Sequence, residues 1–271
     1  MRYIAGAFRY LIKNFIFLFA FVLIPSYFLA VSGSPAAVRA LIDAFIRSGG
    51  NVEIKFGEIF SFFSPFNSYG WAYALIFFAA SVLCLPMLFG FIEKHMRLGF
   101  RTWKGIAGRF NFNFLTTLVV FLVCLVIYEI WALITAGLIY AETFLLRGIA
   151  CSIVALATAV GMVAVLGYLF STFLLWLPCL QITGYNYMDA LVYSNNLSVR
   201  KKGPIFLALF LPALVCFAAR LLIVAFVPFL PAAFLLVELV FLFFILYFCV
   251  LMFVAYFDAA GEERMDLKKK I

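Results

Sequence analysis

The chain has 271 residues, of which 68% are hydrophobic and only 12% are charged, and its mean hydropathy is +1.16. A single soluble core of this length cannot shield so many apolar side chains from water, so the composition excludes a soluble globular protein and indicates that lipid is the main solvent. The formal net charge is +8, which by itself is also compatible with nucleic-acid binding.

Continuous apolar runs of about 20 residues with few charges predict membrane-spanning helices. Because these runs do not alternate with polar residues, helices are favoured over a transmembrane β-barrel. The third and fourth runs are longer than a bilayer requires and should tilt or extend beyond it. The sequence therefore predicts an all-α, polytopic transmembrane helix bundle, a single membrane domain over residues 1–271 whose six spans form three helical hairpins. The predicted spans are 14–31, 69–92, 112–140, 149–180, 204–229 and 230–257.

Basic residues are distributed unevenly between the segments that connect these spans. Fifteen of the 20 Lys and Arg fall in the N-terminal segment, in the loops around 94–109 and 200–202 and in the C-terminal segment, and four fall in the segments on the other side. By the positive-inside rule we expect both termini to be cytoplasmic and the protein to reside in the cell membrane. Topology and attraction to anionic lipid headgroups then explain the net charge, so no nucleic-acid partner is predicted.

The first 31 residues also resemble a secretory signal peptide, with a basic start and Ala30-Val31-Ser32 as a cleavage site. We expect them to be retained as a span, because the apolar run is long for a signal peptide. The basic segment RYIAGAFRYLIKN, residues 2–14, has two interpretations: a helix that lies on the inner leaflet, or charges that only set the topology.

One outer connection, residues 32–68, is long. Ser34, Pro35 and the Gly49-Gly50 pair predict the start and end of a helix, on which Arg39, Asp43 and Arg47 would form one charged stripe on the outer surface. The aromatic stretch that follows, EIFSFFSPFNSYGW, is expected to rest in the membrane interface. It has two candidate roles, a simple re-entry into the second span, which we favour, or a cap over a cavity.

The fourth span is rich in small residues, including the pair Ala157-x-x-x-Gly161. Small residues let neighbouring helices approach closely, so we expect this span at the centre of the bundle. The six cysteines lie within predicted spans without a C-x-x-C motif and are interpreted as apolar fillers. With His95 as the one histidine, neither a metal site nor a cofactor is predicted.

Three charged residues fall within predicted spans: Glu129, Arg220 and Glu238. A charge in the bilayer costs on the order of 3 kcal/mol, so such residues normally face a partner. Arg220 and Glu238 lie at similar depth on an antiparallel hairpin, and we predict that they form a buried cluster with Glu129. The cluster is either an ion pair that fixes the register of the hairpin or a site where the surplus carboxylate binds a cation or a proton.

The predicted cytoplasmic loops carry basic residues that we expect to contact anionic lipid headgroups. No nucleophile, base and metal ligand converge in any known catalytic motif, and Glu93 and His95 are i, i+2 neighbours that point apart on a helix. An enzyme is therefore not predicted. The predicted lipid-facing residues are Arg97, Arg101, Lys104, Arg109, Arg200, Lys201 and Lys202.

Residues 188–211, MDALVYSNNLSVRKKGPIFLALFL, place Ser194, Leu197 and Gly203 ahead of an apolar helix. Together with six spans and a basic segment before the first, this pattern resembles uncharacterised bacterial multi-pass membrane proteins related to the membrane domain of glycerophosphoryl diester phosphodiesterases. The resemblance implies a bacterial cytoplasmic-membrane protein. In that family the phosphodiesterase activity belongs to a separate soluble domain, for which we expect no room here, so the resemblance implies no enzymatic activity.

Two functions are compatible with these features. The first is a non-enzymatic membrane protein that acts through lipid partners, or through a membrane-protein partner, with its basic cytoplasmic face. The second is a small-solute transporter, or a permease subunit, that moves a polar or cationic solute past Glu129, Arg220 and Glu238. Transport requires a continuous polar cavity that reaches these residues, whereas the 36 phenylalanines favour a filled interior and hence the first function.

Overall fold

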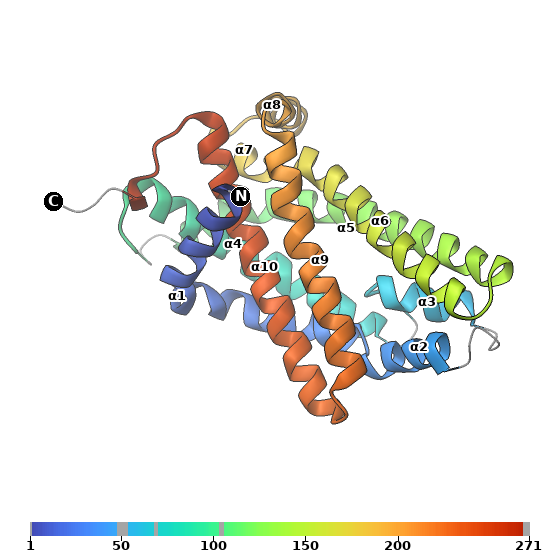
Figure 1. The fold of residues 1–271 in the computed structure, drawn as a ribbon. Coiled ribbons are helices and arrows are strands. Elements are labelled where there is room, and N and C mark those ends of the chain that lie inside the picture. The colour runs from blue at the N-terminus through green and yellow to red at the C-terminus, as the bar shows by residue number, and fades with distance from the viewer. Residues whose placement is uncertain (1, 48–53, 68–69, 103–105, 268–271) are drawn as a thin grey trace.

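The computed structural model describes residues 2–47, 54–67, 70–102 and 106–267, and it is built from helices (Figure 1). Six helical segments are long and apolar enough to cross a bilayer, which confirms the predicted all-α bundle of six spans. The chain is therefore an integral, multi-pass membrane protein. The spans consist of α1 (Arg2–Ser32), α4 (Trp71–Leu98), α5 (Ile106–Leu145), α6 (Ile149–Phe173) continued by α7 (Trp176–Thr183), α9 (Lys202–Phe226) and α10 (Leu230–Ala260).

The spanning helices form a closed ring. Each packs against the next one along the chain, in the order α1, α4, α5, α6, α9 and α10, and α10 then packs against α1. Figure 1 shows α9 and α10 side by side, with α6 next to α9. The predicted hairpins are thus present, and contacts between hairpins close them into a ring around a shared interior.

Apolar side chains are exposed on the outer surface of every helix in the ring. In water this surface would be strongly unfavourable, whereas acyl chains solvate it at no cost, so it identifies the bilayer as the solvent. The inward faces form two apolar clusters, one at each end of the ring. Exposed examples, one from each helix, are Ile16, Leu75, Leu122, Ile153, Val215 and Leu235.

The first and last helices meet at one end of the ring, which we call the terminal end. The Tyr3 hydroxyl donates a hydrogen bond of 2.6 Å to Asp258. Val254 packs close to Gly6, since a Cβ added to Gly6 would lie 3.4 Å from Val254 Cγ1. Tyr3, Ala7 and Leu11 are buried by this packing. The basic N-terminal segment is therefore the beginning of a continuous helix that packs against α10, which differs from the first of its two interpretations, a helix that lies on the inner leaflet.

The small-residue span, α6, is not at the centre of the bundle. It is one member of the ring, and Ala157 and Gly161 are both exposed on its outer surface. No neighbouring helix approaches Gly161, because a Cβ added there would meet nothing within 4 Å. The pattern of small residues does not by itself say which face of a helix they occupy, and this is why the predicted central position is wrong.

The opposite end, which we call the loop end, carries α2 (Pro35–Arg47) and α3 (Phe56–Phe63). The helix predicted after Ser34 and Pro35 is confirmed as α2. Its Arg39 does not join a charged surface stripe, and instead donates hydrogen bonds to the carbonyls of Val224 (3.0 Å), Val227 and Pro228 (3.1 Å). These carbonyls lie at the C-terminus of α9, where a helix leaves its acceptors unpaired, so a cation there is favourable.

The aromatic stretch after α2 also differs from its prediction. Residues 61–65 do not rest in the interface but are buried, and α3 packs against α5 at the loop end of the ring. At the terminal end the sequence did not predict α8 (Tyr187–Val199), which packs against α6 and α7, or the short η1 (Met265–Leu267), which packs against α4.

Gly70 offers a test of the close approach at the loop end. A Cβ at this position would lie 2.5 Å from the Ser32 carbonyl oxygen, so Gly70→Ala has to separate the end of α1 from the start of α4. We expect a loss of about 2 kcal/mol or more in stability, measured as a lower midpoint of thermal unfolding in detergent. Gly57→Ala is the control, because a Cβ there meets nothing within 4 Å. Equal midpoints for the two variants would contradict the close approach.

Candidate binding site inside the helix ring

A cavity of about 430 Å³ occupies the interior of the ring. This volume is within the usual range of small-molecule binding sites, roughly 300–1,000 Å³. We call it the central cavity. All six ring helices line it, with α3 at the loop end and α7 at the terminal end. One lining residue from each ring helix is Leu29, Leu85, Val120, Val163, Leu209 and Met252.

The lining of the central cavity is predominantly Phe, Leu and other apolar residues, with few polar groups. Arg220, Tyr128 and Ser64 lie at the loop end, and Thr117 of α5 lies toward the terminal end. Near Thr117, the Gln181 side chain donates a long hydrogen bond of 3.4 Å to the Thr117 hydroxyl. The Oε1 atom of Gln181 has no hydrogen-bond partner among the described residues. An apolar interior with polar groups at its ends suits a ligand of the same pattern.

Residues 61–67 close the loop end of the central cavity, and we call them the plug. Phe62, Phe63, Ser64 and Pro65 of the plug line the cavity. The favoured sequence-based role, simple re-entry into the second span, therefore gives way to the alternative, a cap over a cavity. After Phe63 the plug is not helical, so its backbone must find hydrogen-bond partners outside regular structure.

Side chains of the ring helices satisfy the plug's backbone. The Arg220 guanidinium donates to the Phe62 carbonyl (3.0 Å) and the Tyr128 hydroxyl to the Phe63 carbonyl (2.6 Å). Both carbonyls belong to the C-terminus of α3 and have no acceptor role within the helix. The Asn67 amide adds bonds to the carbonyls of Ser32 and Ser64, each 3.0 Å.

Arg220 forms no ion pair with Glu129 or Glu238, although such a pair is one of the two interpretations of the predicted cluster. The guanidinium also donates to the Gly33 carbonyl (3.2 Å) and lies over the Phe62 ring at 4.8 Å, and no carboxylate pairs with it in the described part of the chain. Carbonyl dipoles at a helix C-terminus replace the carboxylate, because they present partial negative charge without the cost of burying an anion.

Glu129 and Glu238 have different surroundings. Glu129 accepts a 2.7 Å hydrogen bond from the Ser64 hydroxyl, so it contacts the same plug as Arg220. Its second carboxylate oxygen is buried and has no hydrogen-bond partner in the described part of the chain. Glu238 is half-buried on α10 and makes no hydrogen bond or ion pair with the described residues. The structure thus brings Glu129 and Arg220 together around the plug, leaves Glu238 out, and places only Arg220 of the three in the cavity lining.

Five of the seven basic residues predicted to contact lipid headgroups have described side chains, which lie at the terminal end, and several of these five bind other groups of the protein. Arg97 pairs with Glu93 (2.8 Å) and Lys201 with Asp258 (2.8 Å), while Arg101 bonds to Asn14 (2.8 Å). Lys202 lies 4.3 Å from the Tyr168 ring centre. Arg200 is exposed, and Lys104 and the side chain of Arg109 lie outside the described residues.

Sequence reasoning missed Tyr128, Ser64 and Asn67, whose polar atoms hold the plug. Their sequence signal is weak, because a tyrosine, a serine or an asparagine near a span end is common in membrane proteins. Comparison with protein-family models, with curated proteins and with solved structures finds no match for this chain. The family resemblance inferred from residues 188–211 therefore stays a prediction.

The partner of Arg220 can be identified by a double-mutant cycle. Arg220→Gln should lower stability by on the order of 3 kcal/mol, because two charge-assisted hydrogen bonds to carbonyls are lost. Glu238→Gln should have little effect, and the two changes should be additive because the residues share no contact. The free energy of unfolding is measured in mixed detergent micelles for the two single variants and the double variant. Arg200→Gln is the control for removing an exposed guanidinium. A coupling of about 1 kcal/mol or more would show that Arg220 and Glu238 do pair.

Proposed function

We propose that the chain is a non-enzymatic membrane protein of the cell membrane that binds a lipid, or a lipid-like amphiphile, within the central cavity. The observation that carries this proposal is the apolar cavity of about 430 Å³ that all six ring helices line. An acyl chain is the most abundant apolar group available to a cavity inside a bilayer. The guanidinium of Arg220 at the loop end would lie nearest the polar end of such a ligand.

Transport of a polar or cationic solute has less support. That function requires a polar route to Glu129, Arg220 and Glu238. The lining of the central cavity is mostly apolar, and of these three residues it includes Arg220 alone. A cation would have to leave water for a Phe- and Leu-lined space, at a cost of several kcal/mol with no carboxylate in that lining to offset it. A lipid-like ligand has no such cost.

Filling the cavity tests the proposal directly. In the double variant Val163→Phe with Cys216→Phe, two aromatic rings enter the lining from α6 and α9. We expect this variant to lose at least half of the tightly bound lipid, measured by mass spectrometry of the protein purified in mild detergent. The matched control is Val165→Phe with Val215→Phe, on the same helices but on exposed surfaces, at 47% and 67% exposure.

The control should retain the lipid content of the unaltered protein, since its new rings contact only the bilayer. Circular dichroism and the elution volume of the micelle complex establish that both variants are folded. If the cavity-filled variant folds and keeps its full complement of lipid, the ligand is bound elsewhere and the proposed function is wrong.

The orientation is part of the proposal. The terminal end holds the majority of the basic residues, so the positive-inside rule supports a cytoplasmic location for this end and for both termini. A fluorescent protein fused to the C-terminus should therefore fluoresce, and an alkaline phosphatase fused at the same position should be inactive. The reverse pattern would place the terminal end outside and overturn this assignment.

A further inference from the structure

A second cavity, of about 590 Å³, lies at the terminal end. We call it the charged cavity. It is bounded by the first half of α1, the end of α4 with the residues that follow it, and the segment from the end of α10 to η1. Three parts of the chain that are far apart in sequence thus line one cavity, and eight of its lining residues are charged.

Basic side chains outnumber acidic ones in the charged cavity. The basic residues are Arg2, Arg9, Lys13, Arg101 and Arg264, and the acidic residues are Asp258, Glu262 and Asp266, which leaves a surplus of two positive charges. Positive charges brought together in this way repel one another, so an anion that enters the cavity relieves an unfavourable interaction.

Two of the three carboxylates already have basic partners. Asp258 is bound by Arg2 (3.1 Å) and Lys201 (2.8 Å), and Asp266 accepts two hydrogen bonds from Arg264, of 3.1 and 2.8 Å. Arg9 and Lys13 are exposed and make no ion pair with the described residues. The positive surplus therefore resides on Arg9, Lys13 and Arg101. Among the three lining carboxylates, Glu262 alone forms no ion pair with a described basic residue.

Neutral groups hold Arg101 in place. Its guanidinium donates to the Asn14 side chain (2.8 Å) and to the Lys13 carbonyl (2.9 Å), and it lies 4.8 Å from the centre of the Phe17 ring. Asn14 is itself 2% exposed and is oriented by its bond to the Tyr10 carbonyl (2.9 Å). These contacts hold the guanidinium in position, and no carboxylate of the described residues forms an ion pair with it, which is the arrangement of a preorganised anion site.

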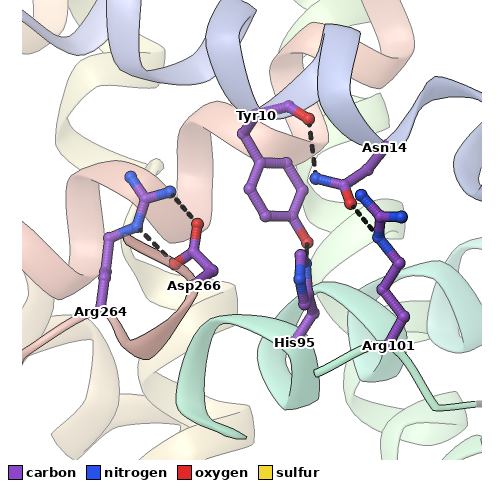
Figure 2. A network of polar contacts seen from close by, with 6 residues as sticks. All are labelled: Tyr10, Asn14, His95, Arg101, Arg264 and Asp266. Atoms are coloured by element: carbon purple, nitrogen blue, oxygen red, sulfur yellow. Dashed lines mark hydrogen bonds and ion pairs between the residues drawn. The ribbon is translucent and has the colours of Figure 1, made fainter. Parts of the chain in front are cut away.

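Tyr10 and His95 separate this guanidinium from the Arg264–Asp266 pair, as Figure 2 shows. The two side chains are buried and share a 2.9 Å hydrogen bond between the Tyr10 hydroxyl and His95 Nδ1. Arg264 lies over the other side of the Tyr10 ring, at 5.9 Å from its centre. The close approach of Met265 to Gly99 positions the segment that carries Arg264, because a Cβ on Gly99 would be 3.0 Å from the Met265 carbonyl oxygen.

We propose that the charged cavity binds a phosphate-bearing anion, held by Arg9, Lys13 and Arg101. A phosphate group carries up to two negative charges and so matches the positive surplus, and a guanidinium presents paired donors that fit phosphate oxygens. The phosphate belongs either to the headgroup of an anionic lipid or to a free phosphorylated solute. This inference is independent of the central cavity and its ligand.

Arg9→Gln is the informative variant, because Arg9 has no contact in the described structure whose loss would unfold the protein. The matched control is Arg200→Gln, which removes an exposed guanidinium at the same end but outside the cavity lining. Two probes distinguish the sources of phosphate: sodium phosphate added to the detergent-solubilised protein against sodium chloride of equal ionic strength, and nanodiscs of phosphatidylglycerol against phosphatidylcholine. The measured quantity is the upward shift of the thermal unfolding midpoint.

We expect at least one probe to stabilise the unaltered protein and the Arg200→Gln variant equally. For Arg9→Gln the half-saturating concentration of phosphate should be about fivefold higher, or the shift in phosphatidylglycerol nanodiscs should fall by half or more. A response to phosphate in detergent assigns the site to a free solute, and a response to phosphatidylglycerol alone assigns it to a lipid headgroup. No response to either probe, or an equal loss in Arg9→Gln and Arg200→Gln, overturns the proposal.

Discussion

A non-helical stretch of backbone at membrane depth has to find hydrogen-bond partners, and this requirement organises the loop end of the protein. Arg220 lies about 9 Å along α9 from the C-terminus of that helix, at 1.5 Å per residue, and the plug reaches the same depth. The Arg220 guanidinium and the Tyr128 hydroxyl donate hydrogen bonds to the last two carbonyls of α3. Arg39 binds the end of α9 in the same way. At both sites the guanidinium of an arginine binds carbonyls at a helix C-terminus that have no partner within the helix, and their partial negative charge takes the place of a carboxylate.

The closed ring explains why the central cavity and the charged cavity have opposite character. Six helices that each contact two neighbours leave an axial space that their apolar inner faces line. The plug closes one end of this space, and α7 lies at the other. Apart from Arg220, no charged side chain of the described residues lines the central cavity. Charged side chains gather instead where α1, α4 and α10 leave the ring, and this is where the charged cavity forms. The two ligand proposals thus follow from one architecture.

The sequence predicted those features that depend on solvent and on local capping. Apolar runs specify the spans, and Ser34 with Pro35 specifies the start of α2. The partner of Arg220 was not predictable, because every residue has a carbonyl and a helix C-terminus inside the membrane leaves no mark in composition. The outward position of Gly161 was missed for a related reason: in lipid, both faces of a helix are apolar, so hydropathy does not distinguish the inner face from the outer one.

The contact between α1 and α10 has a consequence for biosynthesis. The two helices are separated by about 200 residues, and a ribosome that adds roughly 5–20 residues per second needs about 10–40 s to cover that distance. During this interval Tyr3, Ala7 and Leu11 of α1 have been translated but lack the helix that buries them. The surface of α1 that faces α10 therefore stays uncovered during synthesis, and an insertion chaperone or a neighbouring polypeptide has time to bind it before α10 completes the ring.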